Sequence, residues 1–262
     1  MAARTVTPLD AAPPGPPPRL GWTRFSSPPR FHALCTRLLP VLWTLAALLS
    51  LAGLVLGLGV APTDAQQGEV YRILFVHVPA AWIGMVCYLA MAFWGGIGLA
   101  FNTRLAFLVM RALAPTGAAF TALCLWSGAL WGQPTWGTWW VWDARLTSML
   151  LLLFLYAGFL ALVSAIDDPR RADRAGAVLA LGGAVNVPVI YGSVLWWNTL
   201  HQGASITPRG ASMAAPMLWA LLACSLGLWA YAAAAVLSRA RTLALERERG
   251  AEWVRRLAEA KR

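Results

Sequence analysis

Tryptophan is concentrated in one short stretch of this chain. Six of its fifteen tryptophans lie between residues 126 and 142, separated by glycines and a proline. They are Trp126, Trp131, Trp136, Trp139, Trp140 and Trp142. The first three recur every five residues, a spacing that matches neither one face of a helix nor one face of a strand. Tryptophan also gathers at membrane–water interfaces, but an interfacial belt does not require the intervening glycines. We therefore interpret the stretch as a binding platform.

The residue types in this stretch favour a large, planar, apolar ligand. Gly132 and Gly137 each follow a tryptophan, and the missing side chain would let a flat molecule approach the backbone there. Indole rings offer a large apolar contact area, which makes haem the obvious candidate.

Haem also carries two propionates, which need cationic partners at a wet interface. Guanidinium groups pair with carboxylates in a bidentate geometry. Arg72 and Arg145 are the candidate partners of the propionates. Their alternative roles are ion pairs with Glu69 and Asp143, respectively.

Three histidines are present, and two of them flank the tryptophan-rich stretch in the sequence. His77 ends one expected outer loop, just before Pro79, and His201 lies in another. One histidine in each flanking loop would allow iron to be coordinated on both axial sides. A lone histidine near an interface is more often a simple polar residue. The pairing with the tryptophans makes His77 and His201 candidate axial ligands. His32 is expected to have no specific role.

The elements that must position these residues are membrane helices. Hydrophobic residues make up 59% of the 262 residues, charged residues only 12%, and the mean hydropathy is +0.60. A soluble domain has about 25% charged residues. Six apolar segments are long enough to cross a bilayer as helices, which predicts an all-α integral membrane protein. They cover residues 38–60, 79–101, 105–129, 146–166, 175–196 and 213–237. In the fifth, Asn186 beside Pro188 predicts an interhelical hydrogen bond at a kink.

The basic residues predict the orientation of these helices. With both termini in the cytoplasm, only three of the 21 basic residues fall on the outer side, as the positive-inside rule requires. Those three are Arg72, Arg145 and Arg209. The net charge of +10 is thus explained by topology and not by nucleic-acid binding.

Three regions are expected along the chain. Residues 1–37 form a proline-rich disordered cytoplasmic tail, and residues 238–262 form a charged, helical cytoplasmic tail. Residues 38–237 form the six-helix domain, with the tryptophan-rich outer loop at 126–145 between the third and fourth helices. The four cysteines form no C-x-x-C pair, which favours buried thiols over a metal cluster.

The tryptophan-rich stretch also resembles a known signature. Trp131-Gly-x-x-x-Trp136-Gly-x-Trp139-Trp140-x-Trp142-Asp143-x-Arg145 is similar to the WWD motif of haem-handling proteins. Together with the six spans and the two outer histidines, it makes residues 38–240 resemble the haem exporter protein C (CcmC) family of bacterial cytochrome c maturation. The resemblance implies that His77 and His201 are the axial ligands. It also implies a haem platform made of Trp131, Gly132, Trp136, Gly137, Trp139, Trp140, Trp142 and Asp143.

The resemblance implies an assembly factor and not an enzyme. Such a protein would bind haem b at the periplasmic face of the bacterial inner membrane and present it to a membrane-anchored haem chaperone. It would work with an ABC-type ATPase, a second membrane subunit and a small single-span subunit. Two other interpretations remain open from the residues alone. One is a permease that moves haem or another solute, and the other is a b-type electron-transfer cytochrome.

Overall fold

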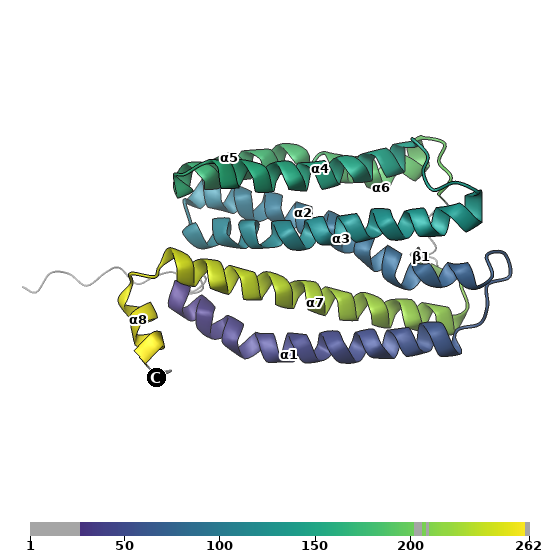
Figure 1. Ribbon diagram of the computed structural model, residues 1–262, viewed down its shortest axis with the longest axis horizontal. Coiled ribbons are helices and arrows are strands. Elements are labelled where there is room, and N and C mark those ends of the chain that lie inside the picture. The colour runs from purple at the N-terminus through teal and green to yellow at the C-terminus, as the bar shows by residue number, and fades with distance from the viewer. Residues whose placement is uncertain (1–26, 202–205, 208–209, 260–262) are drawn as a thin grey trace, which may run out of the picture.

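The computed structural model describes residues 27–201, 206–207 and 210–259, and they form a helical bundle (Figure 1). The long helices are α1 (Pro28–Val55), α2 (Leu74–Phe101), α3 (Arg104–Trp136), α4 (Ala144–Ala165) and α7 (Ala215–Arg247). A fifth span is split into α5 (Pro169–Gly183) and α6 (Asn186–Trp196). The shorter elements are η2 (Leu56–Val60), η3 (Glu69–Ile73), α8 (Glu252–Glu259) and the paired strands β1 (Ile206–Thr207) and β2 (Gly210–Ala211).

Among the described residues, six helices are long and apolar enough to cross a membrane, which confirms the predicted all-α architecture with six spans. The first begins at Pro28 instead of residue 38, because Pro28 and Pro29 favour the first helical positions. Part of the expected N-terminal tail is therefore helical, while residues 1–26 lie outside the described residues. The C-terminal end of α7 likewise extends past residue 237, to Arg247.

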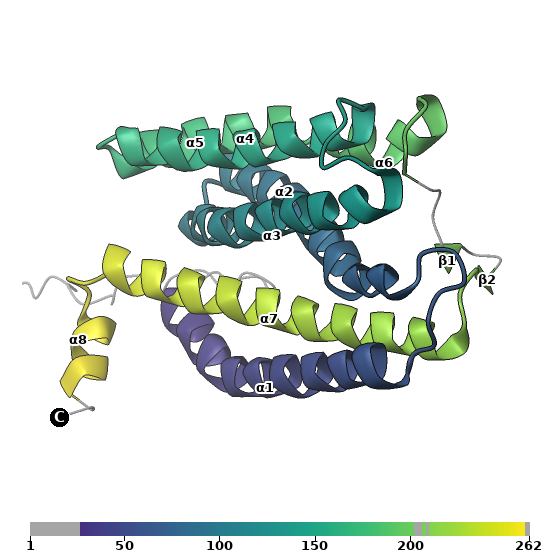
Figure 2. The same ribbon diagram turned by 45° about the vertical axis from the view of Figure 1, so that its right-hand side comes forward.

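The helices are arranged in three layers (Figure 2). α1 packs along α7, α2 packs along α3, and α4 lies with α5 and α6 on the other side of the α2–α3 layer. Small residues allow close approach of the backbones. A Cβ atom on Gly53 of α1 would lie 2.5 Å from the backbone nitrogen of Cys224 on α7. The α1–α7 pair therefore depends on the absence of a side chain at this position.

The break in the fifth span has a local cause. Pro188 lacks an amide hydrogen, and its ring would clash with the carbonyl of Ala184 in a continuous helix. α5 accordingly ends at Gly183 and α6 begins at Asn186. The Asn186 side-chain amide donates a hydrogen bond to the carbonyl of Ser148 on α4, at 2.9 Å. The predicted interhelical hydrogen bond at a kink is thus confirmed.

The tryptophan-rich stretch is mostly helix, which corrects the expected outer loop at 126–145. α3 continues to Trp136, and only residues 137–143 connect it to α4. Positions five apart on a helix differ by about 140° in direction. The three tryptophans at this spacing therefore point to three different sides of α3, which is why no single helix face was visible in the sequence.

Both ends of the connecting segment are fixed by their residues. Gly137 ends α3 in the left-handed region, at a φ of 76°, and its amide bonds the Gln133 carbonyl at 2.9 Å. Glycine adopts this conformation without steric cost. Asp143 caps α4, because its side-chain Oδ1 accepts from the Leu146 amide at 2.8 Å. The segment is therefore short and anchored at both ends.

A buried ion cluster holds the opposite end of the bundle together. The Asp173 side chain on α5 is 3% exposed and contacts Arg247 of α7 at 2.5 Å and Arg111 of α3 at 3.6 Å. Arg111 also donates to the carbonyl of Val163 on α4, at 3.0 Å. Through these contacts Arg111 joins α3 to α4 and α5.

Candidate functional site

A cavity lies at the end of the bundle where α3 meets α4. It encloses about 620 Å³ not filled by protein atoms, a volume that includes space open to solvent. Its walls come from α2, α3, α4, α6 and the segments at 138–141 and 201. Seven residues named from the sequence line it: His77, Gly132, Trp136, Trp139, Trp140, Arg145 and His201.

Helical spacing explains how α2 and α3 face this cavity. His77, Ala81 and Met85 are four residues apart and lie on one side of α2. On α3 the lining residues recur at the same spacing, from Cys124 through Gly128 and Gly132 to Trp136. The cavity therefore lies between α2 and α3. The segment that connects α3 to α4, together with α4 itself, closes one end of it.

His77 lies in the first turn of α2 instead of ending the preceding loop, because η3 runs directly into α2. Its Nδ1 is 3.1 Å from the Ser127 hydroxyl of α3. Its ring packs edge-on against Trp131, with centroids 5.6 Å apart. A Cβ on Gly128 would lie 3.0 Å from the His77 Cε1. Three residues of α3 thus fix the position of this imidazole.

Trp131 supports the site from outside the cavity. Its indole nitrogen donates to the Gln67 side chain at 2.8 Å, which joins α3 to the segment before η3. It does not line the cavity, in contrast to Trp136. Its role is therefore to hold His77 and the outer segment, and it is not part of the cavity wall.

His201 reaches the cavity from the segment after α6. Its ring packs against Trp136 with centroids 5.1 Å apart, and its Nδ1 is 3.6 Å from Asp143 Oδ2. Burial and the positive charge of Arg145 lower the pKa of His201, while Asp143 acts in the opposite direction. The lowered pKa favours the neutral imidazole, which is the form that binds metals.

The two candidate arginines have different surroundings. Arg72 forms the ion pair with Glu69 that was its alternative role, and it donates to the backbone carbonyls of Gly57 and Ala61. It lies outside the cavity wall because it clamps the end of the first span. Arg145 lines the cavity, and no carboxylate of the described residues lies within ion-pair distance of it. Of the two, only Arg145 is placed for a ligand carboxylate.

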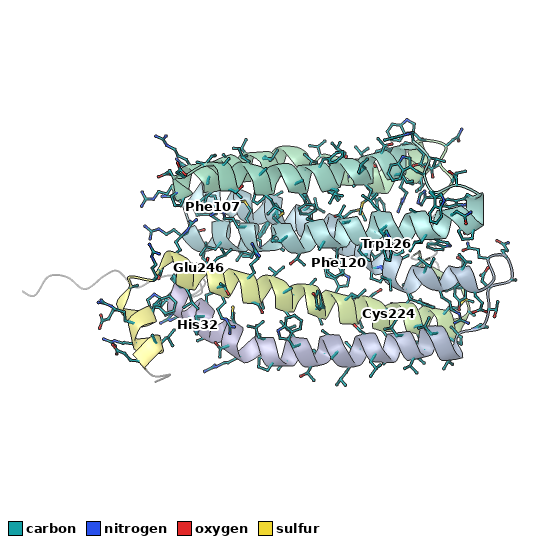
Figure 3. The ribbon with its side chains drawn as sticks, in the orientation of Figure 1. His32, Phe107, Phe120, Trp126, Cys224 and Glu246 are labelled. Carbon is teal, nitrogen blue, oxygen red and sulfur yellow. The ribbon has the colours of Figure 1, made fainter. Side chains whose placement is uncertain are left out.

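Four residues named from the sequence lie around the cavity without lining it. Trp142 is 77% exposed and packs against Trp140, with ring centroids 5.4 Å apart. Gly137 and Asp143 shape the ends of the connecting segment, as described above. Trp126 points outward from α3, toward the same end as the cavity, and His32 lies at the opposite end (Figure 3).

Several buried polar atoms at the site have no hydrogen-bond partner among the described residues. They are Thr135 Oγ1, Trp140 Nε1, Asp143 Oδ2 and His201 Nδ1. Leaving such an atom unpaired costs about 1–3 kcal/mol. Three of these atoms lie within residues 135–143 and the fourth is on His201, which indicates a site whose polar groups are available to a ligand.

Sequence reasoning missed Ser127, and it also missed the soft side chains of the cavity wall. Ser127 lies one helical turn before Trp131, so it belongs to the same side of α3, and this spacing could have identified it. Met85, Cys124 and Met149 line the wall from three helices. Nothing in their local sequence distinguishes them from ordinary core residues, because packing alone brings them together.

Comparison with known proteins identifies the family. Residues 21–255 match the family model CcmC, "Heme exporter protein C". The chain belongs to the haem exporter protein C family. Haem exporter protein C of Escherichia coli K12 is 46% identical over 235 residues, which cover 88% of this chain and 93% of the relative. The Bradyrhizobium diazoefficiens protein of the same name is 50% identical over 190 residues, or 71% of each chain.

The family match covers every helix that forms the cavity. A putative ccmC-like mitochondrial protein of cytochrome c biosynthesis from Marchantia polymorpha is also similar, at 45% identity over 176 residues, which cover 67% of this chain and 73% of the relative. The resemblance to the haem exporter protein C family inferred from the WWD motif and the two histidines is thus confirmed. The residues before position 21 lie outside the family match.

Proposed function

We propose that this protein binds haem at the periplasmic face of the inner membrane and presents it for cytochrome c maturation. The observation that carries the proposal is the convergence of His77 and His201 on one cavity. These residues are 124 positions apart in the sequence and come from different elements. Two imidazoles facing a shared space are suited to hold one iron from both axial sides.

The remaining cavity residues fit the rest of the haem molecule. Trp136, Trp139 and Trp140 offer aromatic surface to the porphyrin ring. Arg145, which has no carboxylate partner among the described residues, would pair with a propionate. Gly132 is buried in the cavity wall, and a Cβ there would lie 3.1 Å from the Thr138 carbonyl. A side chain at this position would therefore crowd the space left for a flat ring.

The family and the charge distribution support the cellular role. Relatives carry the name haem exporter protein C, and one carries a name from cytochrome c biosynthesis. The positive-inside rule would place the cavity end of the bundle in the periplasm. There the protein would hand haem b to a membrane-anchored chaperone. An ABC-type ATPase, a second membrane subunit and a small single-span subunit would complete the assembly.

Visible absorption spectra of the purified protein test the haem site. We expect a sharp Soret band in the wild type that is weakened and shifted in His77→Ala and in His201→Ala. The double variant should retain no haem while still inserting into the membrane. His32→Ala is the matched control, because His32 lies at the opposite end of the bundle (Figure 3). Normal haem spectra in both single variants would contradict the proposal.

A further inference from the structure

The two histidines of the cavity have different neighbours at the same ring nitrogen. His77 Nδ1 is 3.1 Å from the hydroxyl of Ser127, whereas His201 Nδ1 is 3.6 Å from a carboxylate oxygen of Asp143. A neutral hydroxyl thus faces one imidazole and an anion faces the other. Groups that hold the second nitrogen of a metal-binding imidazole fix its tautomer and tune its strength as a ligand.

Ser127 can only accept a hydrogen bond from His77 while its present contacts persist. Its Oγ is 2.7 Å from the Leu123 carbonyl and 3.2 Å from the Cys124 carbonyl, so the single hydroxyl proton points along the helix. The proton between Ser127 and His77 therefore belongs to the imidazole Nδ1. This assignment leaves the Nε2 lone pair of His77 free for iron.

The surroundings of Asp143 differ, because one of its carboxylate oxygens already accepts a hydrogen bond. Oδ1 caps α4 through the Leu146 amide, and Oδ2 is buried without a partner. His201 Nδ1 is also buried without a hydrogen-bond partner and lies 3.6 Å from that oxygen. A small approach of the two groups would satisfy both atoms. Catalytic and ligand-binding contacts are often long in the free protein and tighten when the ligand is seated.

We propose that the two histidines are unequal ligands: Asp143 makes His201 the stronger, retained ligand, and Ser127 leaves His77 the weaker ligand that is released first. This inference rests on the proposed haem site. A hydrogen bond to a carboxylate is roughly twice as strong as one to a neutral group. It also raises the basicity of the imidazole toward a metal. Ser127 and Asp143 are thus positioning residues that act through the histidines.

Unequal ligands would determine which side of the haem opens first when it is handed over. Iron stays bound to His201 while the bond to His77 opens. His77 lies in the first turn of α2, and Trp131 and Ser127 hold it against α3. The side of the haem that faces α2 is therefore the first to become accessible to an exogenous ligand.

Asp143→Asn and Ser127→Ala test the inference on haem-loaded protein in detergent. Asparagine is as good a helix cap as aspartate, so Asp143→Asn removes the charge and keeps the cap of α4. We expect its haem reduction potential to rise and its haem transfer to apomyoglobin to accelerate by about 10–100-fold. Ser127→Ala should leave the potential near the wild-type value but increase the affinity of the ferrous haem for carbon monoxide. Ser127→Thr restores a hydroxyl and should restore the wild-type affinity.

Two results would overturn the inference. One is a shift in potential for Ser127→Ala that equals or exceeds the shift for Asp143→Asn. The other is wild-type behaviour of Asp143→Asn in both potential and haem loss. If Asp143→Asn does not accumulate in membranes, the two Ser127 variants provide the test. Equal carbon monoxide affinities of Ser127→Ala and Ser127→Thr would then reject the inference. Failure of the haem site itself is distinguishable, because it would appear as normal spectra in the histidine variants.

Discussion

At the scale of single residues, two side chains that look equivalent in the sequence have different surroundings in the structure. Arg72 and Arg145 are both expected on the outer side, and each lies within three residues of an acidic residue in the sequence. In the structure Arg72 pairs with Glu69 and donates hydrogen bonds to two backbone carbonyls, whereas Arg145 faces the cavity. A guanidinium without a carboxylate partner at the wall of an aromatic cavity is suited to an anionic group of the ligand.

Replacing Arg145 should therefore weaken haem binding through the propionates. We expect Arg145→Gln to raise the dissociation constant for haem by about 10–100-fold, because a hydrogen bond to a charged group contributes about 1.5–3 kcal/mol. Titration of the haem-free protein followed by the Soret band measures this constant. Haem dimethyl ester, which lacks the propionate charges, is the control and should bind both proteins equally. A loss of equal size with the ester would show that Arg145 acts on the fold instead.

The same contrast shows what the sequence could predict about the site. His77 and His201 could be named because the chain has only three histidines. Trp136 stood out in the tryptophan cluster, and Arg145 was one of only three basic residues expected on the outer side. Ser127 was missed because serine is common in membrane helices and its partner lies 50 positions away. The choice of Arg145 over Arg72 depends on side-chain distances, which no local pattern contains.

At the scale of elements, hydropathy determined the number of helices, and the details at their ends depended on single residues. Six apolar runs predicted six spans, since the hydrocarbon core admits little else. The end of α3 was misplaced because its tryptophans turn to three sides of the helix. Pro134 also resembled a loop signal, although α3 contains it in its last turn.

The ion cluster around Asp173 should stabilise the contact between α3, α5 and α7. Removing one member of a buried pair costs about 3–5 kcal/mol, since the remaining charges lose their partner. Because both arginines are about one-fifth exposed, we expect Asp173→Asn to destabilise the protein by about 3 kcal/mol, at the lower end of that range. Denaturation in mild detergent followed by tryptophan fluorescence measures it.

Asp168→Asn is the matched control for this prediction. Asp168 lies five residues earlier and caps α5 through the Arg171 amide at 2.7 Å, and asparagine preserves such a cap. Its stability should remain near that of the wild type. Equal stabilities of the two variants would show that Asp173 is not a structural centre. Haem spectra should be unchanged in both, because the cluster and the cavity lie at opposite ends of the bundle.

At the scale of the whole molecule, the cavity lies at one end of the bundle, and the start of α1 and the end of α7 lie at the other. The start of α1 and the end of α7 lie together, opposite the segment 137–143 (Figure 1). The cysteines of the chain are all buried, which makes labelling of introduced thiols practicable. We expect Gln133→Cys to react with a membrane-impermeant maleimide in intact spheroplasts, and Arg249→Cys to react only after lysis.

This labelling pattern would follow from the arginine distribution, because basic loops stay in the cytoplasm. The wild-type protein is the control, because it measures any labelling of the four native cysteines. The reverse pattern would place the cavity in the cytoplasm and would exclude a periplasmic haem site.

The break between α5 and α6 gives the cavity one compliant wall. α6 is eleven residues long, carries Ile190 into the cavity and leads directly to the segment with His201. Its main-chain ladder is not continuous with that of α5, so a tilt of α6 need not bend the longer helix. The side chain of Asn186 ties its first turn to α4. We therefore expect this wall to adjust most readily to a rigid, flat ligand, because α6 can tilt without bending a long helix.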